Sequence, residues 1–364
     1  MKQTHANYSL IVLIFILVVF GLAMLASASS VAGFTSQYHD SYYFLKHQLL
    51  YGLLPGVILF IFLARADWRL WQKKSRWLLL ASLVLLVLVL IPQVGVELHG
   101  SRSWLNLGPF SLQPSEIAKL MLLIYLAARL SNGSDQLRHF FSGLLPLIFI
   151  IGLMAGLVAL QPDFGTMSII ILIGLGVCFV AGLRWRHLIF LTVSGSLLFW
   201  AILKKMPQKF ERLQVFLNPE IEPLGIGYHL KQALIAIGTG GIFGMGLGRS
   251  RQKFQYLPEV SGDSIFAIMA EELGFILTLV FIVLILALVF KLIRLAQANS
   301  HGFARLYLVG LALWIGGQSL VNIGAMLGLM PLTGVPLPFV SYGGTALMTL
   351  LAACGLAVRL AREA

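Results

Sequence analysis

The sequence predicts an all-α, polytopic membrane protein with ten transmembrane helices. Hydrophobic residues make up 59% of the 364-residue chain and charged residues only 11%, far more apolar than a soluble domain of this length requires. Apolar runs of about 20 residues recur, as expected for helices that cross a hydrocarbon core about 30 Å thick. Most basic residues lie in alternate short connections between these runs. The whole chain, 1–364, is therefore interpreted as one membrane domain.

The apolar runs define the predicted helices. Ten ranges fit a membrane span: 8–28, 44–64, 77–92, 114–130, 142–160, 166–183, 187–203, 263–290, 303–328 and 341–359. The first lacks the small-residue cleavage site of a removed signal peptide, so we expect it to remain as a membrane helix. Pro92 interrupts the third range, and Glu116 and Lys119 interrupt the fourth. Cys178 and Cys354 lie inside apolar ranges, which favours buried hydrophobic side chains over a disulfide or a metal site.

The connections predict the orientation. With the N-terminus inside, fifteen of the 26 Lys and Arg residues fall in short cytoplasmic loops and tails: Lys2, Arg65, Arg69, Lys73, Lys74, Arg76, Arg129, Arg138, Arg184, Arg186, Lys291, Arg294, Arg305, Arg359 and Arg362. Only three acidic residues join them, Asp67, Asp135 and Glu363. Short loops dominate the positive-inside rule, so both termini are predicted to be cytoplasmic. The net charge of +12 then belongs to the cytoplasmic face and gives no reason to expect nucleic-acid binding.

One long connection, 204–262, faces outward in this topology. It carries eight basic residues: Lys204, Lys205, Lys209, Arg212, Lys231, Arg249, Arg251 and Lys253. They are either the charges of a solvated loop or an outward platform for an anion such as phosphate or pyrophosphate. Within the apolar stretch 227–248, the spacing of Gly240, Gly244 and Gly248 predicts one helix face suited to close packing. A phosphate-binding loop is the alternative, but the stretch lacks the Gly-Lys-Ser/Thr ending of a nucleotide loop.

The end of this connection places carboxylates beside a basic cluster. Two acidic residues, Glu259 and Asp263, follow closely after Arg249, Arg251 and Lys253. The next apolar range carries Glu271 and Glu272. Ionisable groups at membrane depth cost roughly 2.5–3.5 kcal/mol each and usually mark a functional site. A carboxylate beside basic groups suits a reaction that removes a proton and releases an anion.

A second polar stretch, 99–119, precedes and enters the fourth apolar range. Its Gln-Pro-Ser-Glu run is typical of a helix start, with proline in the first turn. Glu116 and Lys119 are three residues apart, so they share a helix face and can pair. Arg102 and Trp104 lie just before this helix, where tryptophan is also expected as a plain membrane anchor.

Two short outward turns carry further polar groups. Asp163, in the turn 161–165, is expected either to cap the following helix or to contribute to a site. The prolines and glycines of the turn 331–344 exclude a simple helix, and such backbone near membrane depth needs protein or a water-filled cavity around it. Gln318 and Asn322, four residues apart, are predicted to donate hydrogen bonds between helices. Four outward connections thus bring polar groups to one face, which predicts a single site opening outward between helices.

At these residues the chain resembles the SEDS (shape, elongation, division and sporulation) family, which comprises FtsW, RodA and SpoVE. The resemblance covers nearly the whole chain, and its motifs are GSRSWLNLGPFSLQPSEIAKL, QPDFGT, the block 225–274 and LTGVPLPFVSYGG. It implies the SEDS fold, which is GT-C-like, with ten helices and both termini inside. The stretch GYHLKQALIAIGTGGIFGMGLGRSRQKFQYLPE is more similar to the division branch, FtsW, than to the elongation branch, RodA.

The resemblance implies a peptidoglycan glycosyltransferase that polymerises lipid II into glycan strands on the outer face of the bacterial cytoplasmic (inner) membrane, in cell division. Asp263 would be the catalytic base that takes a proton from the acceptor sugar's hydroxyl. The residues that would hold substrate and pyrophosphate are Lys119, Arg102, Glu116, Trp104, Arg249, Lys253, Glu259, Asp163, Ser341 and Tyr342. A divalent cation, Mg²⁺ or Mn²⁺, could also neutralise the charge of the leaving pyrophosphate, although no ligand spacing in the sequence indicates a metal site.

The implied partners are lipid II, a class B penicillin-binding protein transpeptidase, other divisome proteins and the lipid bilayer. Three alternatives stay open: an elongation polymerase of the RodA type, a lipid II flippase or other transporter, and a scaffold that only recruits a transpeptidase. A transporter needs polar groups that reach both sides, and a scaffold leaves the embedded charges unexplained. The family commonly has His-Thr-Asp-Phe where residues 261–264 are Ser-Gly-Asp-Ser, so the aspartate is kept and its neighbours differ.

Overall fold

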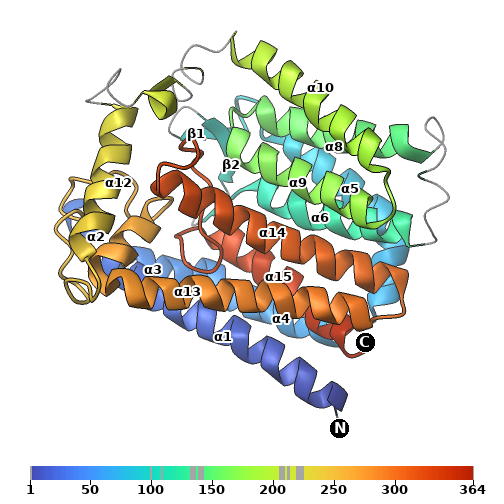
Figure 1. Cartoon of the computed structure of the whole chain (residues 1–364), viewed down its shortest axis with the longest axis horizontal. Helices are drawn as coiled ribbons and strands as arrows, with labels where there is room; N and C mark the ends of the chain where they lie inside the picture. Colours follow the sequence, from blue (N-terminus) through green and yellow to red (C-terminus); the bar gives the residue numbers. More distant parts are fainter. Residues whose placement is uncertain are drawn as a thin grey trace.

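The computed structural model describes residues 2–98, 101–106, 108, 110–131, 137, 143–204, 210, 214–218 and 225–363. Long helices lie side by side and dominate the described part of the chain (Figure 1). The helices are α1 (Lys2–Ala28), α2 (Ser30–Thr35), α3 (Tyr43–Gln48), the π-helix η1 (Leu49–Leu53), α4 (Leu54–Arg65), α5 (Trp68–Leu88), α6 (Pro114–Leu130), α8 (Leu145–Ala159), α9 (Phe164–Val180), α10 (Trp185–Leu203), α12 (Ile226–Gly240), α13 (Ile265–Ala298), α14 (Gly302–Met326) and α15 (Gly344–Ala361).

Each of the ten predicted ranges overlaps a described helix. Five helical segments of the described chain are long and apolar enough to cross a membrane: Tyr8–Ala28, Tyr43–Arg65, Ile265–Ala298, Gly302–Met326 and Gly344–Ala361. Helices α8 and α9 are apolar but shorter. The predicted range 77–92 begins too late, because Asp67 starts α5 by accepting a 3.0 Å hydrogen bond from the Arg69 N–H. An apolar criterion misses this polar first half of the helix.

A small antiparallel sheet corrects the all-α prediction. Its strands are β1 (Gly95–Leu98), β2 (Ser101–Asn106) and β3 (Ser111–Leu112), in the order β1-β2-β3. Ser103 and Leu105 of β2 are buried, whereas Trp104 between them is only partly covered, which is the alternation of a strand with one covered face. These strands are short and rich in polar residues, so apolar length in the sequence does not indicate them.

Helix α15 lies at the centre of the bundle. Buried residues make up 78% of its most apolar window, against 28% for the span Tyr43–Arg65. It packs against α4, α6 and α14. The approach to α4 is close at Gly355, where an added Cβ atom would lie 2.4 Å from the Phe60 carbonyl oxygen. Both chain termini lie at one end of the bundle, whereas α2, α12 and the 241–262 loop lie at the other, which we call the loop end (Figure 1).

Helix α13 is interrupted at Gly274, whose φ is +72°. The segments 241–246 and 271–276 exchange four backbone hydrogen bonds at this break, two donated by each segment. Backbone groups freed by a break in an apolar helix must find partners in the protein. The turn that follows α12 supplies those partners, so the loop end and α13 are joined through their main chains.

The glycine spacing in 227–248 predicted one helix face, and this prediction is wrong. Helix α12 ends at Gly240, and Gly244 and Gly248 lie in the following turns with φ of +80° and +79°. These φ values favour glycine and cannot belong to a right-handed helix. The expected close packing does occur at the first two positions, because added Cβ atoms at Gly240 and Gly244 would lie 2.1 and 2.3 Å from carbonyl oxygens of α13.

Candidate functional site

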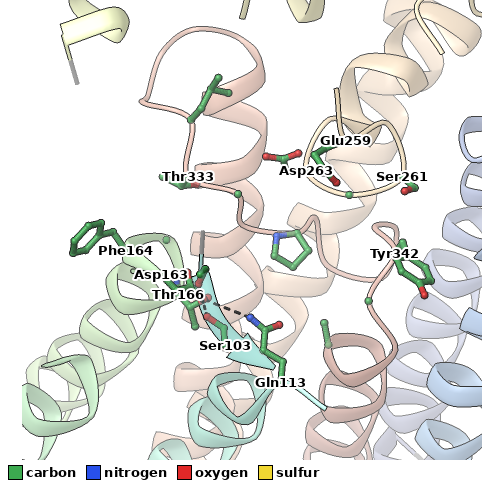
Figure 2. Close-up of a pocket in the computed structure, with 18 of the residues that line it drawn as sticks. Ser103, Gln113, Asp163, Phe164, Thr166, Glu259, Ser261, Asp263, Thr333 and Tyr342 are labelled. Atoms are coloured by element: carbon green, nitrogen blue, oxygen red, sulfur yellow. Dashed lines mark hydrogen bonds between the residues drawn. The ribbon is translucent and has the colours of Figure 1, made fainter. Parts of the chain in front are cut away.

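A cavity of about 1440 Å³ lies among the loops of the loop end. All four outward connections that the sequence singles out contribute to its wall. The lining residues come from the segments 32–51, 101–113, 162–175, 191–196, 253–263 and 331–346, together with His229 of α12. Figure 2 shows the loop with Glu259 and Asp263 on one side and Asp163 with Gln113 on the other.

Asp263 lines this cavity one residue before the residue that caps α13. Its backbone is held from two other segments. The Asn322 side-chain amide donates a 2.8 Å hydrogen bond to the Asp263 carbonyl, and the Ser341 hydroxyl donates a 2.6 Å bond to the Gly262 carbonyl. The Tyr342 N–H donates to the Ser261 carbonyl at 2.8 Å. The carboxylate is therefore carried on a backbone that α14 and the 331–344 turn hold in place.

Glu259 lies in the same loop and also lines the cavity. Its φ is +50°, and its carbonyl accepts hydrogen bonds from the N–H groups of Gly262 and Ser264. The loop is thus a compact turn, and the four-residue spacing of Glu259 and Asp263 does not correspond to a turn of helix. Figure 2 shows both residues on this turn at the cavity wall.

The irregular 331–344 turn is anchored by the two polar residues of α14. The Gln318 amide donates a 2.8 Å bond to the Pro336 carbonyl, and the Asn322 amide donates a 2.8 Å bond to the Val335 carbonyl. Inside the turn, the Leu337 N–H donates to the Ser341 hydroxyl at 2.8 Å. Gln318 and Asn322 therefore donate hydrogen bonds to groups outside their own helix, and the acceptors are backbone carbonyls of the 331–344 turn.

Asp163 caps α9 and faces the cavity. One carboxylate oxygen accepts a 2.9 Å hydrogen bond from the Thr166 N–H, and the other accepts a 3.5 Å bond from the Gln113 amide. The cap expected from the sequence is therefore present, and Asp163 also lies on the cavity wall. Gly165 lets this turn pack against the 331–344 turn, since an added Cβ would lie 2.7 Å from the Thr333 carbonyl oxygen.

Comparison with known proteins places this architecture. The family model for FtsW, RodA and SpoVE, described as "Cell cycle protein", matches residues 8–364. The chain belongs to this family. Stage V sporulation protein E of Bacillus subtilis is 40% identical over 361 residues, covering 99% of this chain and 98% of that protein. The probable peptidoglycan glycosyltransferase FtsW of Coxiella burnetii is 40% identical over 352 residues, covering 95% and 94%.

Two solved structures have the same fold as this chain. A chain from a peptidoglycan synthase complex, described as coordinating polymerization and crosslinking, has a TM-score of 0.80 and 32% identity, covering 98% of this chain and 97% of its own. The rod shape determining protein RodA of Thermus thermophilus has a TM-score of 0.70 and 31% identity, covering 98% and 96%. The chain is therefore a helical membrane protein with the fold of this family.

The residues that flank Asp263 differ from the usual family pattern, and the structure supplies other support. The Ser264 hydroxyl donates a 2.7 Å hydrogen bond to the Pro258 carbonyl and lies 2.6 Å from Nε2 of His229. His229 comes from α12 and lines the cavity. His229 is not among the predicted site residues, although an imidazole in an apolar helix next to the site motif is a usable signal.

Glu116 and Lys119 pair as expected, but they do not line the large cavity. The Lys119 Nζ atom lies 2.8 Å from Oε1 of Glu116, and both side chains are 1% exposed. Nζ also donates a 2.9 Å bond to the Gln318 side chain and lies 4.9 Å from the ring centre of Trp314. Lys119 is thus occupied by buried partners and lies outside the cavity wall, so its assignment as a pyrophosphate ligand stays a prediction.

The two predicted site residues of β2, Arg102 and Trp104, have different surroundings. Trp104 lines the cavity, whereas Arg102 does not. Arg102 instead lies 3.3 Å from the carboxylate of Glu97 on the neighbouring strand β1. Arg102 and Trp104 are two residues apart, which in a regular strand would place them on one face. The register of the β1–β2 pair shifts between Val96 and Glu97, which lie opposite these two residues, and such an irregularity redirects side chains.

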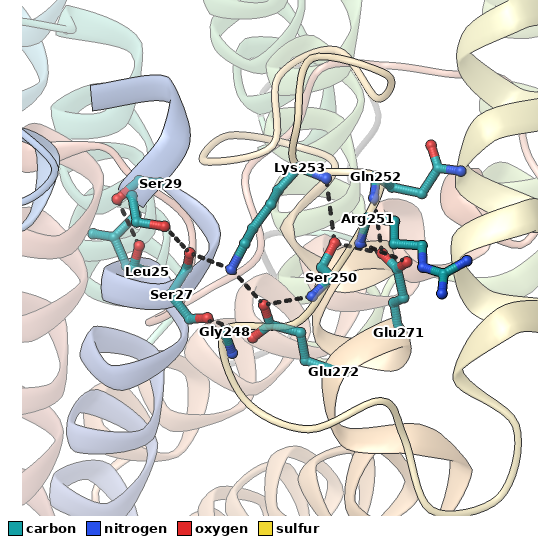
Figure 3. Close-up of polar contacts among 11 residues, drawn as sticks. Leu25, Ser27, Ser29, Gly248, Ser250, Arg251, Gln252, Lys253, Glu271 and Glu272 are labelled. Carbon is teal, nitrogen blue, oxygen red and sulfur yellow. Dashed lines mark hydrogen bonds and ion pairs between the residues drawn. The ribbon is translucent and has the colours of Figure 1, made fainter. Parts of the chain in front are cut away.

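Lys253, expected to hold pyrophosphate, lines the cavity and also belongs to a buried polar network (Figure 3). Its Nζ atom lies 2.9 Å from Oε1 of Glu272, with side chains 3% and 0% exposed. The Ser27 hydroxyl of α1 donates a 2.5 Å bond to Glu272 and accepts a 3.1 Å bond from the Gly248 N–H. The charge of Lys253 is therefore neutralised, and its contacts join the loop to α1 and α13.

Glu271 has a similar role in the same network. Its carboxylate accepts a hydrogen bond from the Ser250 hydroxyl and further bonds from the N–H groups of Arg251 and Gln252, at 3.0 and 3.4 Å. Both of these α13 carboxylates, Glu271 and Glu272, thus hold the 248–253 loop in place and lie outside the cavity lining. Arg249, another predicted anion ligand, is exposed and also lies outside that lining.

The described wall of the cavity therefore carries more acidic than basic charge. It contains three carboxylates, Asp163, Glu259 and Asp263, and a single lysine, Lys253, which is paired with Glu272. The outward platform of basic residues expected for an anion is not formed by the described residues, and Lys205, Lys209 and Arg212 lie outside them. In the described part of the chain, no group of three or more His, Cys, Asp or Glu could hold a metal ion.

Proposed function

We propose that this chain polymerises lipid II into glycan strands at the outer face of the bacterial cytoplasmic membrane, as a division-type member of its family, with Asp263 as the general base. The activity class, peptidoglycan glycosyltransferase, follows from membership of the family and from relatives that carry that name. The observation that carries the site assignment is the placement of Asp263 on the wall of a 1440 Å³ cavity, on a backbone anchored by Asn322 and Ser341.

The chemistry needs one proton acceptor and one leaving group. The acceptor sugar's hydroxyl attacks the anomeric carbon of the lipid-linked sugar, the new glycosidic bond forms, and the bond to the pyrophosphate breaks. The Asp263 carboxylate takes the hydroxyl proton, which leaves the attacking oxygen neutral in the product. A base must be within hydrogen-bond reach of that hydroxyl, and a backbone held from two segments keeps the carboxylate at a constant position.

The leaving pyrophosphate needs positive charge beyond what the described wall provides. A divalent cation such as Mg²⁺ or Mn²⁺ is typically held by one or two carboxylates together with phosphate oxygens, and it neutralises the charge that develops on the leaving group. Glu259, exposed and on the cavity wall, fits that arrangement as the protein ligand. Basic residues of the 204–262 connection that lie outside the described part are the other candidates.

The lipid part of the substrate is accommodated by an apolar arm of the cavity. The lining continues along α9 and α10 through Ile171, Leu175 and Leu191 and includes Gly195, one turn after Leu191 on α10; its polar members there are Ser168, Thr192 and Ser196. A polyprenyl chain is best bound by such aliphatic surface, because its transfer from water to apolar surroundings is favourable. The arm lies between membrane-facing helices, so a lipid tail can reach the bilayer while its sugar occupies the polar part.

We further propose ten membrane-crossing helices with both termini in the cytoplasm. The ten helices that match the predicted ranges, the common end of both termini in Figure 1 and the basic short loops support this arrangement. The cavity at the loop end then faces outward. A class B penicillin-binding protein is proposed as the transpeptidase partner, supported by the similar chain from a complex that coordinates polymerization and crosslinking.

The test is strand formation from purified lipid II. Asp263→Asn should abolish polymerisation while leaving the thermal unfolding midpoint unchanged, because the substitution is nearly isosteric and removes only the proton acceptor. Asp67→Asn is the matched control: Asp67 caps α5, where asparagine caps equally well. Normal strand yield from a well-folded Asp263→Asn variant would rule out the base assignment. A wild-type protein that moves lipid II across vesicles without polymerising it would instead establish the flippase alternative.

A further inference from the structure

Five ring-bearing residues form a continuous wall on one side of the cavity: Phe44, His47, Tyr51, Phe110 and Tyr342. The ring centres of His47 and Tyr51 are 4.5 Å apart, and those of Tyr51 and Phe110 are 5.8 Å apart in a nearly parallel arrangement. Phe44 meets Tyr342 edge-on at 5.0 Å. The Tyr342 hydroxyl lies 2.9 Å from Nδ1 of His47. We call this group the aromatic wall.

The aromatic wall is held in place by polar contacts behind it. Gln48, only 1% exposed, accepts a 3.0 Å hydrogen bond from the Gly343 N–H and donates a 3.5 Å bond to the Ser341 carbonyl. At Gly52, in the π-helical turn η1, an added Cβ would lie 3.1 Å from Cα of Gly344. Single π-turns inserted in helices frequently occur at functional sites. This turn keeps the rings of α3 and η1 against the start of α15.

The same backbone carries the proposed base. Tyr342 of the wall donates its N–H to the carbonyl of Ser261, and Ser341 donates its hydroxyl to the carbonyl of Gly262. Both acceptors lie within two residues of Asp263. The separation between the aromatic wall and the Asp263 loop is therefore set by direct main-chain contacts, and a ligand ring resting on the wall would be held relative to the base.

The composition of the wall matches the surface of a pyranose. A sugar ring has faces of C–H groups, which pack on aromatic rings, and an edge of hydroxyl and acetamido groups, which need hydrogen-bond partners. The wall offers aromatic faces together with the phenol of Tyr51 and the imidazole of His47. The aromatic wall contains no Lys, Arg, Asp or Glu side chain, so it suits the neutral sugars and not the pyrophosphate of the substrate.

We infer that the aromatic wall is a saccharide subsite, which binds an N-acetylated pyranose of the peptidoglycan substrate and positions it for Asp263. The inference rests on the proposed function, because the family membership supplies the reason to expect a glycan. Tyr51 and Phe110 are its central residues, because they form the nearly parallel pair within the cavity. The sugar comes either from the growing strand or from the incoming disaccharide, and both present the same chemistry to the wall.

The experiment compares Tyr51→Leu and Phe110→Leu with Tyr51→Phe, which keeps the ring. Phe15→Leu, a change at a 65% exposed position on α1 away from the wall, is the control for aromatic content. The binding probe is a soluble β-1,4-linked N-acetylglucosamine tetrasaccharide, followed by saturation-transfer NMR on the full chain in detergent. Loss of a stacked ring should weaken binding about 3- to 10-fold, whereas Tyr51→Phe and Phe15→Leu should bind as the wild type does.

Polymerisation assays show which sugar occupies the wall. Shorter strands at unchanged KM for lipid II would identify the growing strand, and a raised KM at normal strand length would identify the incoming disaccharide. Unchanged probe binding, KM and strand length in both leucine variants, with unfolding midpoints equal to the wild type, would overturn the inference. Asp263→Asn should bind the tetrasaccharide normally, because the wall and not the base binds the sugar. Wild-type protein that binds the probe but makes no strands would contradict the proposed function and leave the saccharide subsite intact.

Discussion

Gly21 of α1 lies directly against the main-chain carbonyl of Phe339, and an added Cβ atom at Gly21 would lie 2.1 Å from that oxygen. Phe339 has a φ of +67°, a conformation that a bulky residue rarely adopts without support from its surroundings. The first helix thus supports the 331–344 turn, which in turn carries contacts to the Asp263 loop. Gly21, far from Asp263 in sequence, therefore bears on the geometry of the candidate base.

Gly21→Ala should lower both stability and polymerisation, because a methyl group there forces α1 away from the turn. The expected loss is about 1–3 kcal/mol, typical of overpacking. Gly152→Ala on α8 is the matched control, since nothing lies within 4 Å of an added Cβ there, and it should stabilise the helix slightly. Thermal unfolding in detergent and strand yield measure both effects, and equal behaviour of the two variants would contradict the proposed contact.

Lys253→Met should destabilise the protein by about 3–5 kcal/mol, because it leaves the Glu272 carboxylate buried without its partner. The double variant Lys253→Met/Glu272→Leu should recover much of that loss, since it removes both charges. Arg249→Met, at an exposed neighbouring position, should change the unfolding midpoint little. A stable Lys253→Met protein that has lost only lipid II binding would restore the pyrophosphate assignment of Lys253.

Lys119→Met should reduce activity because it destabilises the folded protein. Glu116 would be left at 1% exposure without its cation, at a cost of about 3–5 kcal/mol in stability. Lys231→Met on α12 removes an exposed lysine and should alter stability by no more than about 0.5 kcal/mol. The comparison is made by thermal unfolding and by strand yield per folded protein. Full stability with complete loss of activity in Lys119→Met would point to a direct role in the reaction.

Asp163→Ala should lose the α9 cap and about 1 kcal/mol of stability, whereas Asp163→Ser should keep most of it. If Asp163 also contacts substrate, the serine variant will be stable but less active than the wild type. Unfolding midpoints and kcat/KM for both variants separate the two roles. Equal activity per folded protein in serine variant and wild type would limit Asp163 to capping.

The orientation is tested by cysteine labelling in a background with Cys178→Ala and Cys354→Ala. Gln255→Cys, exposed at the loop end, should react with a membrane-impermeant thiol reagent in intact spheroplasts. Lys73→Cys, exposed on α5, should react only after permeabilisation. The physical reason is the concentration of basic residues in the short loops on the side of Lys73. The reverse pattern would overturn both the topology and the outward-facing site.

The helices and the gathering of the motifs can be predicted from the sequence because their signals are local. Apolar length marks the ten predicted ranges, and the irregular composition of 331–344 and the Asp163 turn marks the outward turns. Capping by Asp163 also depends only on residues within three positions of it. Such features need no knowledge of the tertiary structure.

The roles of the charged residues could not be predicted in the same way, because their partners are distant in sequence. Lys119 is satisfied in part by Gln318, 199 residues away, and Glu272 by Ser27, 245 residues away. Lys253 and Asp263 both line the cavity, but the Lys253 ammonium is paired with Glu272 of α13. The aromatic wall was likewise missed, since Tyr51, Phe110 and Tyr342 come from three separate segments.

The main-chain pairing between 241–246 and 271–276 has a consequence for the lengths that this part of the chain can adopt. Four backbone hydrogen bonds join the residues on the two sides of the 247–270 segment, and Glu271 and Glu272 bind residues 250–253 within it. An inserted or deleted residue between 247 and 253 would force one of these two sets of bonds to break. We therefore expect epitope tags and loop grafts to be rejected here, and length variation among natural homologues to avoid this stretch.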